Sequence, residues 1–221
     1  MQAGRSLVIG AGGGIGAALL RCLGDQAIGI GRTTQPAIDL LDEDSIEAAA
    51  RDVREHGPFL RIIDATGALT IGGRGPEKRL LDLDAAGMAQ AFAINAIGPA
   101  LLLKHFVDLL PRQGRCVFAT LSARVGSIGD NRLGGWYSYR ASKAALNQVL
   151  RSASVEVARR RPEAVLLALH PGTVRTGLSA AFTAPDQGFS SDDAASRLMS
   201  VMETAAESGV FLDYAGTPVP W

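Results

Sequence analysis

Lysine, histidine and cysteine are scarce in this sequence of 221 residues, and its formal net charge is zero. Acidic and basic residues number 22 each, so the composition gives no electrostatic reason to expect a nucleic-acid partner. The three histidines and two cysteines are scattered, and their spacing is not that of a metal site. We therefore expect neither a bound metal nor a nucleic-acid partner.

The two cysteines, Cys22 and Cys116, lie far apart in apolar stretches of the sequence. A disulfide framework in a small secreted domain normally needs several closely spaced cysteines. The pattern instead predicts two buried free thiols in a reducing compartment.

Long uncharged segments are also scarce. The N-terminal run from Ser6 to Leu20 is too short to span a bilayer, and its glycines lie in the middle, which is not typical of a signal peptide. We expect no other run of membrane-spanning length, no membrane partner and a cytoplasmic location.

Short apolar runs alternate with longer segments of helical periodicity. The runs are mostly continuous and lack polar alternation, which is typical of parallel strands covered on both faces. The pattern predicts one α/β domain over residues 1–221, a doubly wound, Rossmann-type parallel sheet of about seven strands with helices on both faces. Strands are predicted at 6–10, 27–30, 37–39 (very short), 60–64, 115–121, 164–170 and 209–212, and helices at 44–56, 84–110, 137–161 and 192–208.

The turn after the first predicted strand is rich in glycine and reads IGAGGGIG, residues 9–16. Glycines at this point let the backbone approach a pyrophosphate, which then meets the N-terminus of the next helix. The position between a strand and a helix favours a dinucleotide site over a turn that only packs a helix. Two registers are possible, Gly10, Gly14 and Gly16 or Gly12, Gly14 and Ala17, and the expected cofactor-binding residues are Gly10, Gly12, Gly13, Gly14, Ile15 and Gly16.

Arg32 follows the second predicted strand, and no acidic residue comes after it until Asp39. In this architecture a carboxylate at that point binds the ribose of NAD, whereas an arginine can pair with the 2′-phosphate of NADP. The sequence therefore favours NADP over NAD, unless Arg32 is an ordinary loop charge.

Lys143 is one of only three lysines, and two tyrosines precede it. It lies four residues after Tyr139 and six after Tyr137, and only the spacing of four places two side chains on one face of a helix. A nearby ammonium group stabilises a phenolate, so Lys143 is expected to lower the pKa of Tyr139. This pair predicts a proton donor or acceptor for a carbonyl/alcohol substrate, although the spacing alone also fits an ordinary helix-surface pair.

These motifs together resemble the short-chain dehydrogenase/reductase family over essentially the whole chain. The resemblance rests on the glycine register of Gly10, Gly14 and Gly16, on DATG (64–67), on Asn95, on Tyr139 and Lys143, and on HPGTVRT (170–176). Within the family, the segment GSIGDNRLGGWYSYRASKAALN (126–147) and the ending FLDYAGTPVPW (211–221) resemble C-factor and Sniffer-like carbonyl reductases.

The resemblance implies an NADP-dependent oxidoreductase that transfers hydride between the nicotinamide and a small carbonyl or alcohol substrate. Its catalytic set would be Tyr139, Lys143, Ser122 and Asn95, and further cofactor contacts would be Asp39, Leu40, Thr66, Gly67, Pro171, Gly172, Val174 and Thr176. It also implies a homodimer or homotetramer.

One position departs from the family pattern. Ala123 stands where these relatives carry the serine that orients the substrate carbonyl, so Ser122 is the first candidate to replace that serine and Ser127 the second. This departure, and the likeness to C-factor, leave open a dinucleotide-binding signalling or sensor protein with little turnover. A mononucleotide-binding module without a redox role is a third possibility.

Overall fold

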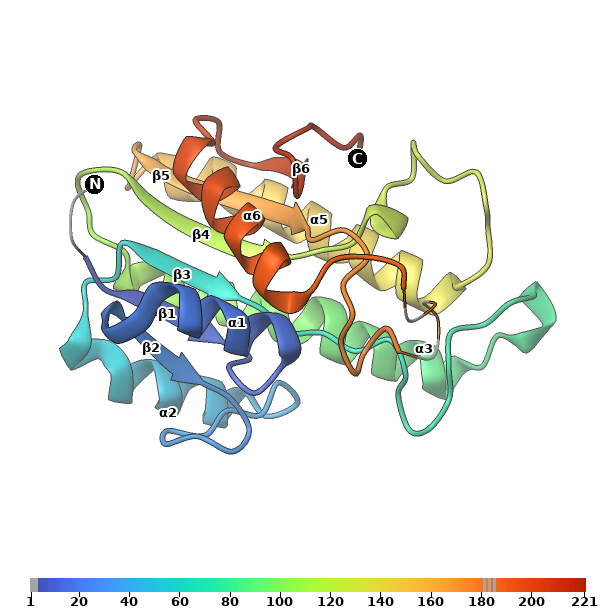
Figure 1. Cartoon of the computed structure of the whole chain (residues 1–221). Helices are drawn as coiled ribbons and strands as arrows, with labels where there is room; N and C mark the ends of the chain where they lie inside the picture. The colour runs from blue at the N-terminus through green and yellow to red at the C-terminus, as the bar shows by residue number, and fades with distance from the viewer. Residues whose placement is uncertain (1–3, 181, 183, 185) are drawn as a thin grey trace.

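The computed structural model of the chain describes residues 4–180, 182, 184 and 186–221. Six parallel strands form one sheet in the order β2-β1-β3-β4-β5-β6 (Figure 1). Most strand residues are buried, as their continuous apolar sequences predict, and the partly buried ones are mainly in β2. The strands are β1 (Ser6–Ile9), β2 (Ala27–Ile30), β3 (Arg61–Asp64), β4 (Cys116–Leu121), β5 (Ala164–His170) and β6 (Val210–Asp213).

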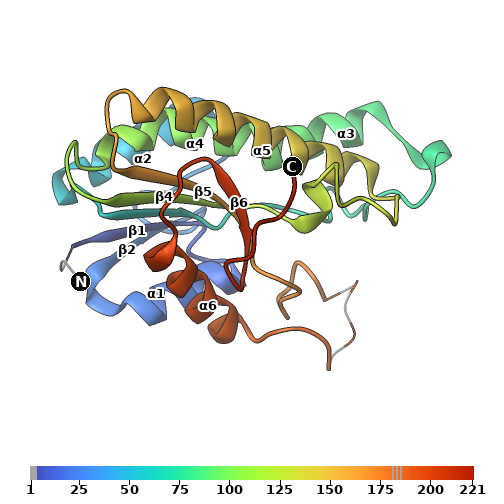
Figure 2. The same cartoon turned by 90° about the horizontal axis from the view of Figure 1, so that it is seen from above.

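Helices cover both faces of the sheet (Figure 2). On one face, α2 (Glu43–Val53), α4 (Gly98–Phe106) and α5 (Tyr137–Ala158) bury their apolar residues against the strands. On the other face, α1 (Gly14–Leu23) and α6 (Ser191–Thr204) do the same. The predicted α/β class, with one parallel sheet between two helix layers, is therefore confirmed.

The sheet has six strands where about seven were predicted, because the very short segment 37–39 is not a strand. It forms a single bridge, between Gly31 and Ala37. The hydroxyl of Thr34 accepts from the N–H of Gly31 at 2.7 Å and donates to the carbonyl oxygen of Pro36 at 2.7 Å. The N–H of Gly31 and the carbonyl of Pro36, which backbone hydrogen bonds between two paired strands would use, are thus bonded to the side chain of Thr34.

Residues 85–109 form a continuous helical run that is long and apolar enough, by length and composition, to cross a membrane. The expectation that no such run exists is therefore wrong. In the structure this run is α3 (Ala85–Phe92), a π-helical turn (Ala93–Ile97), α4 and a short 3₁₀ turn, and α4 buries Leu102 and Phe106 completely in the core. Core helices pass the same test of length and composition, so the run is weak support for a membrane span.

The cysteines are both free, but only one is buried. Cys116 lies inside β4, as predicted, whereas Cys22 is exposed near the end of α1. The fully buried residues of α1 are Gly16, Ala18 and Leu19, and Leu20 and Leu23 pack partly buried against the core, whereas Cys22 between them is exposed.

Candidate active site

The carboxyl ends of β1, β3, β4 and β5 meet at one edge of the sheet, and the motifs found in the sequence follow these strands. In open parallel sheets, ligands bind outside this edge. The turns after β1 and β5 lie at one part of the edge, and the residues around Tyr139 lie at another.

The glycine turn after β1 is built by close backbone approaches. Gly10 has φ +89°, and a carbon added to it would lie 2.9 Å from the carbonyl oxygen of Ala65. A carbon added to Gly16 would lie 2.2 Å from the carbonyl oxygen of Gly10, so a larger residue does not fit there. Together with the tight contact at Gly14, these contacts favour the register of Gly10, Gly14 and Gly16.

The N-terminus of α1 is suited to a phosphate group. In the described part of the chain, no side chain caps this helix, and its first turn contains no acidic residue. A carbon added to Gly12 would meet no atom within 4 Å, so the backbone here is open to a ligand. Unpaired N–H groups and the positive end of a helix dipole favour an anion, so this turn fits the pyrophosphate of a dinucleotide.

The segment after β5 reaches the glycine turn. A carbon added to Gly14 would lie 2.7 Å from the methyl group of Thr176. Val174 is buried and forms a bridge with Phe189, which fixes the path of this segment. The structure thus brings the predicted cofactor residue Thr176 to the glycine turn, and Pro171 and Gly172 lie just before it, at the end of β5.

Arg32, Asp39 and Leu40 follow β2. Gly31 lies beside the turn, since a carbon added to it would be 3.6 Å from the backbone nitrogens of Ala11 and Gly12, and the neighbouring Arg32 is exposed. The Asp39 carboxylate accepts from the N–H of Leu41 at 2.9 Å. Leu40 packs against Gly98 at the start of α4.

Three predicted residues meet at the next part of the edge. A carbon added to Gly67 would lie 3.3 Å from both Asn95 Oδ1 and Lys143 Nζ. Asn95 is buried in the π-helical turn and is held by Ala68, whose N–H donates to Oδ1 at 2.8 Å and whose carbonyl accepts from Nδ2 at 2.8 Å. The structure thus brings together Asn95, Gly67 and Lys143.

Thr66 organises a buried carboxylate beneath this junction. Its N–H and hydroxyl donate to Asp64 Oδ1 at 2.9 and 2.5 Å, and Thr120 donates to Oδ2 at 2.6 Å. Burial raises the pKa of Asp64, and these hydrogen bonds and the charge of Lys143 oppose that rise. In this structure Thr66 therefore contributes to the site by holding the Asp64 carboxylate with two hydrogen bonds.

The predicted effect of Lys143 on Tyr139 is wrong in direction. Burial raises the pKa of Tyr139 to about 12. The ammonium group of Lys143 donates to the carbonyl oxygen of Leu121 at 2.9 Å, and burial lowers the pKa of Lys143 to about 8, against the opposing charge of Asp64. The sequence spacing places the two side chains on one helix face. It does not reveal that burial has a larger effect on the pKa of Tyr139 than the charge of Lys143 has.

The serines near β4 do not line the cleft described below. The Ser122 hydroxyl is buried and donates to Asn147 Oδ1 at 2.6 Å. The Ser127 hydroxyl accepts from the N–H of Asp130 at 3.0 Å and stabilises a turn. Ala123 lies between β4 and the short 3₁₀ turn that follows it.

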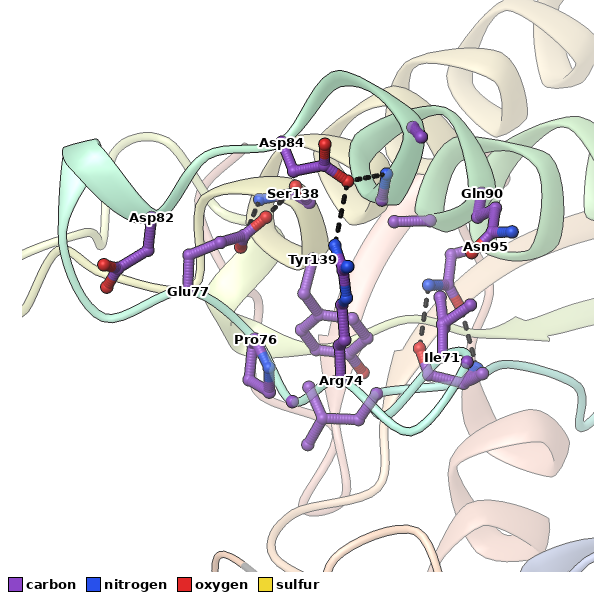
Figure 3. A pocket seen from close by; sticks show the side chains of 17 residues that line it. Ile71, Arg74, Pro76, Glu77, Asp82, Asp84, Gln90, Asn95, Ser138 and Tyr139 are labelled. Carbon is purple, nitrogen blue, oxygen red and sulfur yellow. Dashed lines mark hydrogen bonds and ion pairs between the residues drawn. The ribbon is translucent and has the colours of Figure 1, made fainter.

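A cleft of about 440 Å³ opens beside Tyr139 and Asn95 (Figure 3). Its wall comes mainly from the loop after β3 and from the start of α3. Sequence reasoning assigned no role to most of these residues, because the loop has no motif. The lining includes Ala68, Leu69, Ile71, Arg74, Pro76, Glu77, Asp82, Asp84, Gln90 and Ser138.

Aromatic side chains pack beside the cleft. The rings of Trp136 and Tyr139 meet edge to face, with their centroids 6.2 Å apart. The ring of Phe182 packs in the same way on Trp136 at 5.5 Å. Trp136 contacts Tyr139 without lining the cleft itself.

A glycine turn, a helix N-terminus and a Tyr/Lys/Asn group at the carboxyl edge of a parallel sheet define a dinucleotide-binding α/β protein. Residues 25–212 match the family described as enoyl-(acyl carrier protein) reductase. The chain belongs to the short-chain dehydrogenase/reductase family of NAD(P)-dependent oxidoreductases. This confirms the family predicted from the sequence.

Similar proteins include a dehydrogenase, a carbonyl reductase and a protein named C-signal. The chain is 30% identical to 1-hydroxy-2-glutathionyl-2-methyl-3-butene dehydrogenase of Rhodococcus sp. (strain AD45) over 232 residues, which cover 97% of this chain and 98% of the relative. It is 38% identical to C-signal of Myxococcus xanthus over 143 residues, 63% of this chain and 82% of the relative. An NADPH-bound carbonyl reductase from chicken fatty liver superposes over both complete chains with a TM-score of 0.86 and 24% identity.

Proposed function

We propose that this protein is an NADP-dependent carbonyl reductase or alcohol dehydrogenase. The observation that carries the proposal is the position of Asn95, which contacts the Gly67–Lys143 junction on one side and lines the cleft with Tyr139 on the other. The glycine turn lies at the same edge of the sheet. Bound NADPH would supply the hydride for reduction of a carbonyl carbon.

The residues of the chain would bind the substrate and move the proton. Tyr139 donates its phenolic proton to the carbonyl oxygen, and a pKa of about 12 keeps the phenol protonated at neutral pH, as a donor requires. Lys143 supplies the adjacent cation and would hold a ribose hydroxyl of the cofactor. Asn95 supports the proton relay, and Ser122 orients the carbonyl after exchanging its bond to Asn147 for one to the substrate.

The cofactor residues complete the proposal. Gly12 and the N-terminus of α1 would hold the pyrophosphate, and Arg32 would pair with the 2′-phosphate of NADP. The segment from Pro171 to Thr176 would cover the nicotinamide side. NADPH-bound relatives of the same fold support NADP, and the exposed Arg32 beside the turn agrees with it.

The test is turnover with NADPH or NADH on a panel of aldehydes, ketones and quinones, followed by loss of nicotinamide absorbance. The expected result is oxidation of NADPH in preference to NADH, with a loss of about 10³-fold in kcat for Tyr139→Phe. Tyr137→Phe, two residues away on the same helix, is the matched control and should keep full activity. Turnover that survives in Tyr139→Phe would refute the assigned proton donor.

A signalling or sensor role is the second candidate. It is favoured by the similarity to C-signal and by Ala123 at the position of the expected serine. This role predicts tight NADPH binding with no turnover on any substrate of the panel. A homodimer through α4 and α5 and a cytoplasmic location complete the proposal and are tested by sedimentation and by cell fractionation.

A further inference from the structure

The loop after β3 is bonded to the first turn of α5, the helix that carries Tyr139 and Lys143. The carboxylate of Glu77 accepts from the N–H of Ser138 at 3.1 Å and from the Ser138 hydroxyl (Figure 3). The carbonyl oxygen of Glu77 also accepts from the N–H of Trp136 at 2.5 Å. Glu77 thus accepts three hydrogen bonds, two from Ser138 and one from Trp136, although about sixty residues separate it from them in the sequence.

The start of α5 needs such a partner. Trp136 is the N-cap residue, and in the described part of the chain its side chain makes no capping bond. Ser138 is the second residue of the helix, so its N–H is among the four that have no partner within the helix. A carboxylate at this end also interacts favourably with the helix dipole. Glu77 therefore acts as the N-terminal cap of α5, supplied by another part of the chain.

The backbone before α5 is strained. Gly134, Gly135 and Trp136 have φ values of 63°, 63° and 53°, and Trp136 is the only non-glycine residue with positive φ in the described part of the chain. The two glycines adopt this conformation freely, but for Trp136, which carries a Cβ, it costs about 1 kcal/mol or more and persists only when the surroundings hold it. The bond from Trp136 N–H to Glu77 is one restraint. Arg140 adds another, because its Nε donates to the carbonyl of Gly135 at 2.9 Å.

Glu77 and Ser138 also line the cleft together with Tyr139. Ser138 is buried and directly precedes Tyr139, so a shift of the cap moves the phenol. Burial alone would raise the pKa of Glu77, but hydrogen bonds from Ser138 hold it below its ordinary value, so the carboxylate is ionised at neutral pH. The cap is thus a charged group in the wall of the cleft.

We propose that Glu77 is a positioning residue that caps α5 from the cleft loop and thereby sets the place of Tyr139 relative to the substrate. The proposal rests on the proposed function, because it assigns Tyr139 as the proton donor. The cofactor turn lies elsewhere at the edge of the sheet, so loss of the cap should change the chemical step and leave NADPH binding unchanged. Misplacement of a catalytic group by about 1 Å is enough to cost about 100-fold in rate.

The test compares Glu77→Ala, Glu77→Gln and Ser138→Ala, with Lys78→Gln as the control. Lys78 is the exposed neighbour of Glu77 and does not line the cleft beside Tyr139. We expect kcat to fall about 30-fold in Glu77→Ala and less in Glu77→Gln, which keeps a neutral acceptor. The Kd for NADPH, measured by its fluorescence, should stay within about twofold, and the control should match the wild type.

A second measurement, the fluorescence emission of Trp136, does not depend on turnover. The sequence has two tryptophans, so in a Trp221→Phe background Trp136 is the only one, and its fluorescence reports on the cap. We expect Glu77→Ala and Ser138→Ala to shift its emission in the same way, and the double variant to shift it no further than the larger single change. Lys78→Gln should leave the emission unchanged.

The outcomes separate the two proposals. If the wild type turns over no substrate, the proposed function fails, while the Trp136 emission still decides whether Glu77 caps α5. If the wild type is active but Glu77→Ala keeps its kcat and its Trp136 emission, the positioning role is wrong. A parallel loss of kcat, NADPH affinity and melting temperature in Glu77→Ala would also overturn it, because general destabilisation would then explain the effect.

Discussion

The two halves of the site are built in different ways. The cofactor half uses backbone and glycine: Gly10 and Gly16 lie at positions where a carbon would meet main-chain oxygen atoms. The substrate half uses side chains from distant segments, such as Glu77 and Ser138. Glycines grouped in one turn leave a pattern in the sequence, whereas a hydrogen bond between side chains of distant segments does not. The first half could therefore be predicted, and the wall of the second could not.

Replacement of Lys143 should give the largest effect on the substrate half. Lys143→Met is expected to lower kcat by about 10³-fold. It should also raise the free energy of unfolding at pH 7 by roughly 1–3 kcal/mol, because a buried ammonium group is removed. The folded pKa of about 8 lies below the ordinary 10.5, so the cost of this charge is fully present below pH 8 and is lost as the pH rises to about 10.5.

Urea unfolding at pH 7 and at pH 10 would check this result. The exposed Lys104, which is bonded to Glu43, gives a control in Lys104→Met, with full activity and no gain in stability. If Lys143→Met proved less stable than the wild type at pH 7, the hydrogen bond to Leu121 would outweigh the burial of the charge.

The cofactor half is probed by two glycines four residues apart. Gly16→Ala places a carbon 2.2 Å from the carbonyl oxygen of Gly10, so we expect the free energy of unfolding to fall by roughly 2–4 kcal/mol. Gly12→Ala meets no atom within 4 Å and should change stability by less than about 0.5 kcal/mol. Its methyl group enters the space proposed for the pyrophosphate, so its affinity for NADPH should fall about 10-fold.

Thermal unfolding and NADPH titration of both variants would separate packing from binding. Equal losses of stability in Gly12→Ala and Gly16→Ala would contradict the register of Gly10, Gly14 and Gly16. Unchanged NADPH affinity in Gly12→Ala would place the pyrophosphate elsewhere.

The smallest effect is expected at the two serines near β4. Ser122→Ala should lower kcat about 10-fold if its hydroxyl orients the carbonyl, and Ser127→Ala should stay within about twofold. Steady-state kinetics of both variants and of Ala123→Ser would check this assignment. A neutral Ser122→Ala combined with a higher kcat in Ala123→Ser would show that position 123, and not Ser122, faces the substrate.

The sequence predicted most elements well, since all six strands and the long helix α5 lie within a few residues of their predicted places. It failed where the outcome depends on tertiary surroundings. The segment 37–39 has the composition of a strand, but the Thr34 hydroxyl binds the backbone beside it. Burial raises the pKa of Tyr139, and the Leu121 carbonyl engages the ammonium group of Lys143; neither is visible in a spacing of four residues.

The missing strand has a consequence for the outer border of the sheet. A strand at a sheet border offers unpaired N–H and C=O groups to other chains and is a common starting point for aggregation. Here β2, only four residues long, is that border, and Thr34 bonds the N–H of the next residue, Gly31. One hydroxyl group thus shortens the surface on which another chain could add a strand.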